Sequence, residues 1–170
     1  MAGTCFVIMP FGGDFDMLYE RVYVPAIQAV GLTPLRADEI YDNQAILQDI
    51  DCAIREATVI LADVTGRNPN VNYELGAAHA LRKETVIVTA DARDVPSDYR
   101  HLRYLCYNRT DFDWNRQLTE ELQKTLETVL DRLHKTQRSG RARSGWRRSG
   151  GPASRNGWQS RRKMTGKNVK

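Results

Sequence analysis

Short apolar runs alternate along this chain with segments of helical periodicity, and no other feature constrains the fold as strongly. Three of the runs lack the polar alternation of a half-exposed strand, which is typical of parallel strands buried on both faces. These runs are residues 5–9, 59–62 and 85–88, and weaker strand candidates lie at 31–35 and 104–107. Strand and helix in alternation predict an α/β fold with right-handed crossovers.

Apolar residues at helical spacing occupy four of the intervals between and after these runs. They predict helices over residues 14–30, 43–57, 71–83 and 114–134. Pro25 lies inside the first helix and should kink it, because proline has no N–H to donate. Five strands with such crossovers favour a Rossmann/flavodoxin-like, doubly wound five-stranded parallel sheet, in the compact flavodoxin-like strand order.

The charges divide the chain into two parts. Residues 136–170 contain eleven of the 25 basic residues and no acidic one, which leaves 14 basic against 21 acidic residues in 1–135, a net charge of −7. This tail also holds six of the twelve glycines and no Leu, Ile or Phe. It buries too little apolar surface to offset the entropy of ordering. We therefore predict an acidic domain over 1–135 and a disordered Arg/Gly/Ser-rich basic tail over 136–170.

Several classes of protein and site are excluded by what the sequence lacks. No apolar run approaches the ~20 residues of a membrane helix, and the run at 5–9 is too short, and preceded by no basic residue, for a signal peptide. The three cysteines are too scattered for a disulfide frame or a metal site, at positions Cys5, Cys52 and Cys106. These features predict a cytoplasmic protein without membrane contact, metal or cofactor.

Ligands of a doubly wound sheet bind beyond the carboxyl ends of the strands, so the loops at that edge are the candidate sites. Pro10, Phe11, Gly12 and Gly13 follow the first strand, and the two glycines allow backbone N–H groups to approach a ligand closely. The competing interpretation is a tight turn that requires glycine. Asp38 follows the second strand, where it either contacts a sugar or base or belongs to a solvated polar loop.

The loop after the third strand is the most informative. Asp63 ends an apolar strand, which would place its carboxylate at the rim of the sheet. Asn68 and Pro69 are typical of a helix N-cap and first helical position. Glu74 then falls within the early helix, and the largely apolar segment 75–81 predicts that this helix is buried against the sheet.

Glu74, near the positive end of a buried helix, should be ionised and only partly solvated, which suits a carboxylate nucleophile that attacks a sugar carbon. The competing interpretation is a glutamate favoured there by the helix dipole alone. His79 is more typical of a packed core histidine than of a base. Asp49 and Asp51 lie on the preceding helix, and the sequence does not decide which of them, if either, reaches the site.

Three segments together resemble the nucleoside 2-deoxyribosyltransferase-like superfamily, and more closely its bacterial branch of TIR-like nucleotide-binding proteins. They are residues 6–12 (FVIMPFG), 36–39 (RADE) and 62–76 (ADVTGRNPNVNYELG), of which the third is the most specific. The resemblance covers residues 4–134, and the basic tail has no counterpart in it. The family places a further acid about two dozen residues before its nucleophile, and at the nearest position here stands Ile50.

The resemblance implies a Rossmann-like domain that acts on N-glycosidic bonds without a cofactor. Glu74 would attack the anomeric carbon and displace the base, and Asp63 matches an acid at the end of the preceding strand. The loop at 11–13 would face the sugar or its 5′-phosphate, where Asn70 and Asn72 are further hydrogen-bonding candidates. Sites of this family are often completed by a neighbouring subunit, so a homo-oligomer is expected.

Two classes of function therefore stand beside each other. The first is glutamate-dependent cleavage or transfer on a nucleoside or nucleotide. The alternative is a non-catalytic nucleotide- or NAD-binding sensor module, or a TIR-like NAD hydrolase, in a defence or signalling system. Separately, Arg and Lys interleaved with Trp146 and Trp158 in the tail predict nucleic-acid contact through phosphates and stacking, against the alternative of a solubilising extension.

Overall fold

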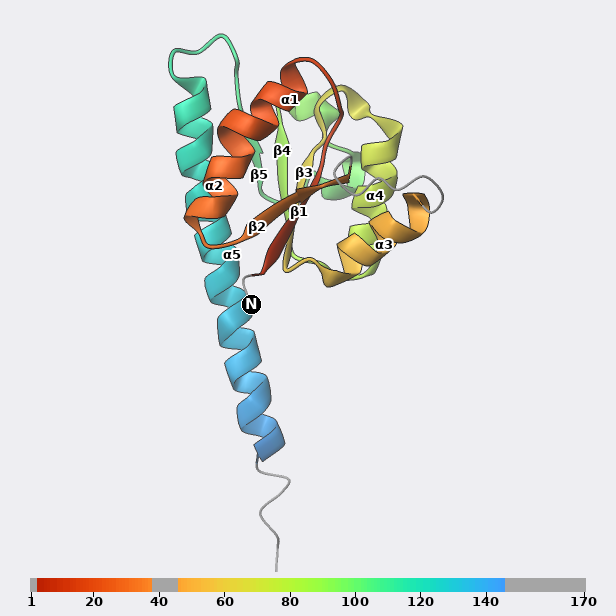
Figure 1. The fold of residues 1–170 in the computed structure, drawn as a ribbon, viewed down its shortest axis with the longest axis vertical. Helices are drawn as coiled ribbons and strands as arrows, with labels where there is room; N and C mark the ends of the chain where they lie inside the picture. The colour runs from red at the N-terminus through yellow and green to blue at the C-terminus, as the bar shows by residue number, and fades with distance from the viewer. Residues whose placement is uncertain (1–2, 38–45, 146–170) are drawn as a thin grey trace, which may run out of the picture. The chain divides into compact units, whose positions relative to one another are not determined.

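The computed structural model describes the backbone of residues 3–37 and 46–145 and the side chains of residues 3–37 and 48–136. Parallel strands form a five-stranded sheet in the order β2-β1-β3-β4-β5 (Figure 1), which confirms the predicted flavodoxin-like architecture. The strands are β1 (Thr4–Ile8), β2 (Thr33–Arg36), β3 (Val59–Asp63), β4 (Thr85–Thr89) and β5 (Tyr104–Cys106).

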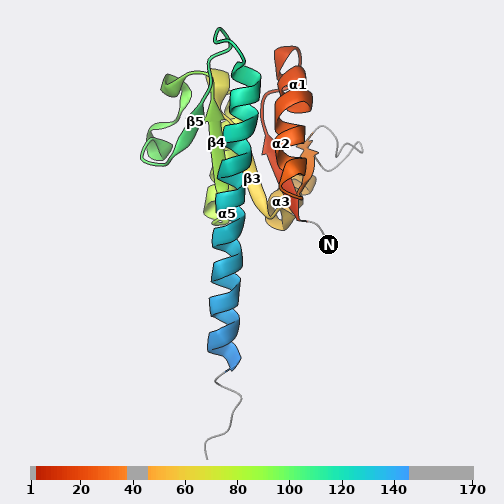
Figure 2. The same cartoon turned by 90° about the vertical axis from the view of Figure 1, so that its left-hand side faces the viewer.

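Helices cover both faces of this sheet (Figure 1), and Figure 2 shows the last helix in front of the strands on one of them. The helices are α1 (Asp14–Leu18), the π-helical η1 (Tyr19–Tyr23), α2 (Val24–Ala29), α3 (Ile46–Glu56), α4 (Pro69–Ala80) and α5 (Trp114–Gly145). Short 3-10 turns follow the strands at η3 (Thr65–Arg67), η4 (Ala92–Asp94) and η5 (Ser97–Tyr99).

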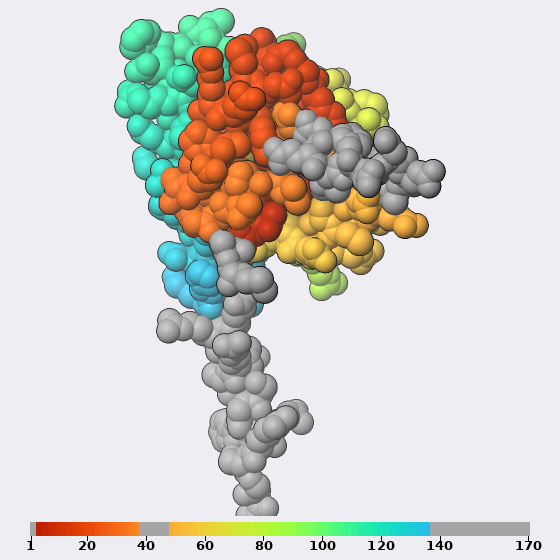
Figure 3. All heavy atoms as spheres, viewed as in Figure 1, coloured from red at the N-terminus to blue at the C-terminus, as the bar shows by residue number. Residues whose placement is uncertain are grey.

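Two hydrophobic cores lie on opposite faces because successive strand side chains point to opposite sides. On one face, Val7 and Leu61 pack against the helix formed by α1, η1 and α2 and against α5. The space-filling view shows these helices side by side (Figure 3). On the other face, Phe6 and Ile60 pack against α3 and α4.

The first helix accommodates its proline by a local change of helix type. The elements α1, η1 and α2 follow one another without a break, and in η1 the N–H of Val24 donates to the carbonyl of Tyr19, five residues earlier. Pro25 has no N–H, so one α-helical hydrogen bond is missing at this point. The wider π-helical turn directly before it absorbs that loss. The predicted disturbance at Pro25 thus takes the form of a π-helical segment.

The last helix is longer than the periodicity predicts. It continues from His134 to Gly145, so residues 136–145, which we expected to begin the disordered tail, are helical. This segment contains two glycines and two serines beside its Gln, Arg and Ala residues, so its helix follows from the extension of an existing helix, which avoids the cost of nucleation. The rest of the predicted tail, 146–170, lies outside the described residues. Tertiary contacts divide the chain into Met1–His134 and Lys135–Lys170, and the sites below belong to the first unit.

No helix within the described ranges, 3–37 and 46–145, is both long enough and apolar enough to span a membrane.

Candidate functional site

The strand order creates a switch point between β1 and β3. From β1 the chain crosses one face of the sheet to β2, and from β2 it returns over the other face to β3. In sheets of this order, ligands bind at the carboxyl edge where the direction of winding reverses. The loops after β1 and β3 and the start of α4 meet this edge, so most of the predicted site residues are gathered there. Asp38 lies outside the described residues.

The loop after β1 has a backbone that favours glycine. Gly12 and Gly13 have φ angles of 88° and 57°, in the left-handed region. Apart from the adjacent residues, no atom of the described chain lies within 4 Å of a Cβ built on either glycine. The N–H of Gly12 donates to Oδ1 of Asp16 at 3.3 Å, so this group stabilises the turn. Phe11 is 50% exposed, whereas Pro10 is buried. A ligand at this loop could therefore contact the ring of Phe11 and the exposed backbone of Gly12 and Gly13.

Arg36, at the end of β2, is a residue whose role the sequence does not reveal. It is buried, and its Nη1 donates to Oδ1 of Asp16 at 2.9 Å. Its guanidinium carbon lies 4.4 Å from the ring centroid of Tyr19 and 5.6 Å from that of Phe11. Ion pairing and cation–π contacts thus hold Phe11 and α1 against the end of β2.

Asp63 ends β3 at the carboxyl edge of the sheet, as expected, but its side chain is fully buried, with 0% exposure, and does not face solvent. Its Oδ1 accepts from the N–H and the hydroxyl of Thr65, at 3.0 and 2.5 Å. Its Oδ2 accepts from the hydroxyls of Tyr23 at 2.7 Å and Tyr107 at 3.3 Å. Burial raises the pKa of Asp63, and these hydrogen bonds oppose the rise. Its carboxylate therefore joins η1, β3 and the end of β5.

The contacts of Tyr23 and Tyr107 with Asp63 could not be predicted from the sequence. These tyrosines lie 40 and 44 residues from it along the chain, and no short-range pattern predicts such convergence. A second link runs from the same region to the first loop: Nη1 of Arg109 pairs with Oδ2 of Asp14 at 2.8 Å. The Arg109 guanidinium also lies over the rings of Phe15 and Tyr107. The carboxyl edge is thus braced by a connected polar network.

The predicted start of α4 is confirmed. Oδ1 of Asn68 accepts from the N–H groups of Asn70 at 2.9 Å and Val71 at 3.4 Å, and Pro69 takes the first helical position. The preceding turn needs a glycine, since Gly66 has a φ of 77°. The N–H of Gly66 donates to Oδ2 of Asp94 at 2.7 Å. These hydrogen bonds fix where α4 begins.

Glu74 is half-buried in the second turn of α4, beside the face through which Leu75 and Ala78 pack against the sheet. Burial raises its pKa from 4.5 to about 7, with no compensating hydrogen bond or cation among the described residues. The carboxyl group is therefore only part-ionised at neutral pH, where we expected full ionisation. A group with this pKa can act as nucleophile, base or acid near pH 7.

The two asparagines of the predicted site point in different directions. Each helical residue advances by about 100°, so Asn70 and Glu74, four residues apart, share a side of α4. Asn72 lies about 160° from Glu74 around the same helix. Its Oδ1 is buried and has no hydrogen-bond partner in the described part of the chain. The structure thus brings Asn70 to the side of Glu74 and directs Asn72 elsewhere.

The two candidate acids on α3 also differ in direction. Ile54 is fully buried, and Asp51 lies about 60° from it around the helix whereas Asp49 lies about 140° away. Both aspartates are half-buried. Asp51 is thus nearer to the packed face of α3. Within the described residues, no three His, Cys, Asp or Glu side chains lie close enough together to hold a metal ion.

Comparison with known proteins finds a likeness in fold among solved structures. No family model and no curated protein matches the chain. Among solved structures it is similar to a 2-deoxyribosyltransferase from the psychrotolerant bacterium Bacillus psychrosaccharolyticus, with 14% identity and a TM-score of 0.49 over 68% of this chain and 90% of that one. Likeness of this degree assigns neither an activity nor individual residues.

Proposed function

We propose that this chain cleaves or transfers the N-glycosidic bond of a nucleoside or nucleotide, with Glu74 as the nucleophile. The observation that carries the proposal is the state of Glu74: a half-buried carboxyl group whose pKa is raised to about 7 and which no described residue neutralises. A carboxylate that is shielded from water and has no cation beside it lowers the stability of the fold. Groups in this state are concentrated at functional sites. The sugar chemistry is supported by the resemblance of segment 62–76.

The reaction has two steps, in which Glu74 is first the nucleophile and then the leaving group. An oxygen of the carboxylate forms a bond to the anomeric carbon, the carbon–nitrogen bond breaks, and its electron pair and a proton from the medium go to the departing base. Water or a second base then attacks the same carbon, the ester C–O bond breaks with its electron pair returning to Glu74, and the attacking group releases a proton to the medium, which restores the carboxylate. In this proposal Asn70, one turn earlier on the same side of α4, hydrogen-bonds a sugar hydroxyl.

The raised pKa gives this mechanism a pH dependence of known sign. A nucleophile must be ionised, so kcat/KM should rise with pH and level off above a pKa of about 7. If Glu74 instead delivered a proton to the leaving base as a general acid, kcat/KM would fall above that pH.

Asp63 enters the proposal as a positioning residue. It has no exposed surface and each of its oxygens accepts two hydrogen bonds, so it acts on the site by holding Thr65 and the two tyrosines. The Asp63→Asn variant should lose thermal stability and some kcat while its pH profile keeps the limb set by Glu74. A loss of activity as deep as that of a Glu74 variant would place Asp63 in the chemistry itself.

The experiment incubates the protein with nucleosides, deoxynucleosides, their 5′-monophosphates and NAD, and measures free base by chromatography. Glu74→Gln keeps the size of the side chain and removes the nucleophile, so base release should fall about a thousandfold or more. Glu121→Gln, an exposed glutamate on α5, is the matched control. Intact mass after acid quenching should show a glycosyl adduct on the unmodified protein and not on Glu74→Gln. Full activity of Glu74→Gln would reject the nucleophile.

One observation favours a second candidate function, a nucleotide- or NAD-binding sensor module. The enclosure of Asp63 leaves Glu74 as the accessible acid of the predicted catalytic pair, which suffices to hydrogen-bond a ribose hydroxyl. The same panel separates the two functions. Saturable binding of a nucleotide without free base would support the sensor, and release of nicotinamide from NAD would identify NAD as the glycoside that is cleaved.

A further inference from the structure

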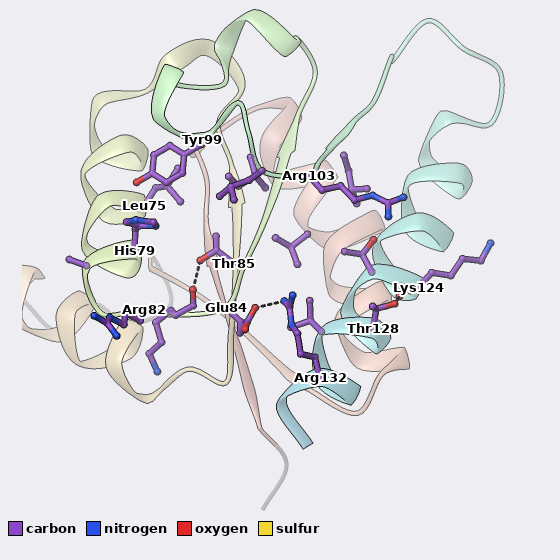
Figure 4. Close-up of a pocket in the computed structure, with 18 residues that line it drawn as sticks. Leu75, His79, Arg82, Glu84, Thr85, Tyr99, Arg103, Lys124, Thr128 and Arg132 are labelled. Atoms are coloured by element: carbon purple, nitrogen blue, oxygen red, sulfur yellow. Dashed lines mark hydrogen bonds and ion pairs between the residues drawn. The ribbon is translucent and has the colours of Figure 1, made fainter. Parts of the chain in front are cut away.

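We infer that this chain carries a second binding site, separate from Glu74, for a small amphipathic anion: an apolar or aromatic body with one acidic group. A cavity of about 890 Å³ lies between α4, the β4–β5 edge of the sheet and α5 (Figure 4). This volume falls within the roughly 300–1,000 Å³ of ordinary ligand pockets. Leu75 and His79 line it from α4, and Glu74 is not among its lining residues.

The cavity exists because β5 is shorter than β4. Strand β5 pairs with Ile87, Val88 and Thr89 alone, so the described residues leave Thr85 and Val86 without a strand neighbour on that side. The space beside them is open between the two helical layers. Two residues of free edge are too short for an added peptide strand, since strands usually need three or more residues. The opening therefore suits a small molecule.

Eight of the 18 residues that line the cavity are apolar or aromatic, enough to contact the body of an amphipathic ligand. The lining includes side chains from both hydrophobic cores, namely Leu75, Val86, Ile87, Tyr99, Leu105 and Val129, and the more exposed Leu102. Leu102 is 38% exposed. Tyr99 contacts His79 edge-on, with ring centroids 5.6 Å apart. His79 is exposed, so the prediction of a packed core histidine is wrong, because the short β5 leaves this flank of α4 uncovered.

The charges around the cavity are mostly positive although the domain as a whole is acidic. Five basic residues and one acidic residue line it: Arg82, Lys83, Arg103, Lys124, Arg132 and Glu84. Glu84 is paired with Arg132, and the ammonium group of Lys83 donates to the carbonyls of Arg55 and Ala57.

Arg103 is the cation best placed to receive an acidic group. It lies across the cavity from the Glu84–Arg132 pair and extends toward α5 (Figure 4). It is exposed, and no other residue in the described part of the chain pairs with it. In a domain of net charge −7, an unpaired arginine beside an apolar cavity is complementary to an anion with an apolar body. A neutral apolar ligand would make no use of it.

The test uses the full chain and 8-anilinonaphthalene-1-sulfonate, an aromatic anion whose fluorescence rises in apolar sites, with neutral N-phenyl-1-naphthylamine as its uncharged counterpart. The anion should bind saturably and more tightly than the neutral probe. Arg103→Glu should weaken binding of the anion about fivefold or more and leave the neutral probe unchanged. Thr128→Trp places an indole in the cavity and should remove binding of both probes.

Matched controls exist for both variants. Arg21→Glu makes the same charge change at an exposed arginine on η1. Thr119→Trp alters a threonine of α5 whose hydroxyl, like that of Thr128, donates to the carbonyl four residues earlier at 2.8 Å. Circular dichroism checks that each variant is folded. The inference is overturned if the unmodified chain does not bind the anion, if both probes bind equally, or if Arg103→Glu behaves as its control. Weakening by Glu74→Gln would also overturn it, since the probe would then occupy the other site.

Discussion

The Glu74 carboxyl group binds a proton more tightly in the folded chain than in the unfolded one, so it links stability to pH. Its pKa is about 7 in the fold against an ordinary glutamate value of 4.5. Below pH 4.5 it is neutral in both states and costs nothing. As the pH rises from 4.5 to 7 the unfolded chain ionises first, so the folded state loses stability across this window and the loss is complete above it.

Replacing Glu74 by glutamine should therefore stabilise the protein in a pH-dependent way. At pH 8 the free energy of unfolding should rise by about 1–2 kcal/mol, a value reduced from the full shift because the side chain keeps part of its solvent contact. At pH 4 the two proteins should be equally stable. Urea denaturation at both values measures this, with Glu121→Gln as control. Equal stability at pH 8 would mean that Glu74 is solvated and would weaken its assignment as a functional carboxyl group.

At the level of single residues, the sequence predicted what depends on local pattern. The N-cap at Asn68 follows from its own side chain and the proline after it, and the structure has that cap. The environment of Asp63 does not follow from the sequence, because the groups that bury it come from η1 and from the end of β5. The role of Arg36 could not be predicted for the same reason, because its burial depends on the rings of Phe11 and Tyr19, which lie outside its own strand.

At the level of elements, the start of α4 controls where Glu74 lies, so its cap offers a test. Asn68→Ala removes the acceptor for the N–H groups of Asn70 and Val71. The variant should lose about 1 kcal/mol of stability, measured by denaturant unfolding, and the proposed activity should fall with it. Asn68→Asp keeps the acceptor and should retain both. If Asn68→Ala unfolds like the unmodified protein, the cap does not determine the position of α4.

The best-predicted elements are the strands that are buried on both faces of the sheet. The strands buried on both faces appear as continuous apolar runs, and their observed bounds differ from the predicted ones by no more than two residues. The segment 75–81 was predicted to be buried against the sheet, and Leu75 and Ala78 are buried while His79 is exposed. That difference depends on how far β5 extends beside β4, which the composition of α4 does not encode.

At the scale of the whole molecule, the unequal distribution of charge predicts that RNA binds to the basic C-terminal segment and not to the acidic domain. Residues 146–170 hold eight basic residues, no acidic one, and both Trp146 and Trp158. Without them the chain keeps 17 basic against 21 acidic residues, which repels a polyanion. Removing 146–170 should therefore abolish retention of single-stranded RNA at low salt. Each phosphate contact steepens the fall of log affinity with log salt by about 0.7, so that slope should flatten with the truncation.

A chain that carries a Gly/Ser segment of equal length in place of 146–170 separates charge from length in this experiment, and should bind RNA no better than the truncated chain. Replacing the two tryptophans alone should weaken retention without changing the salt slope, since stacking involves no counterion release. RNA retention that survives the truncation would instead locate binding in the acidic unit, and the basic segment would then serve solubility. The release of base from nucleosides should be the same in all these proteins, because Glu74 and the network around Asp63 lie within Met1–His134.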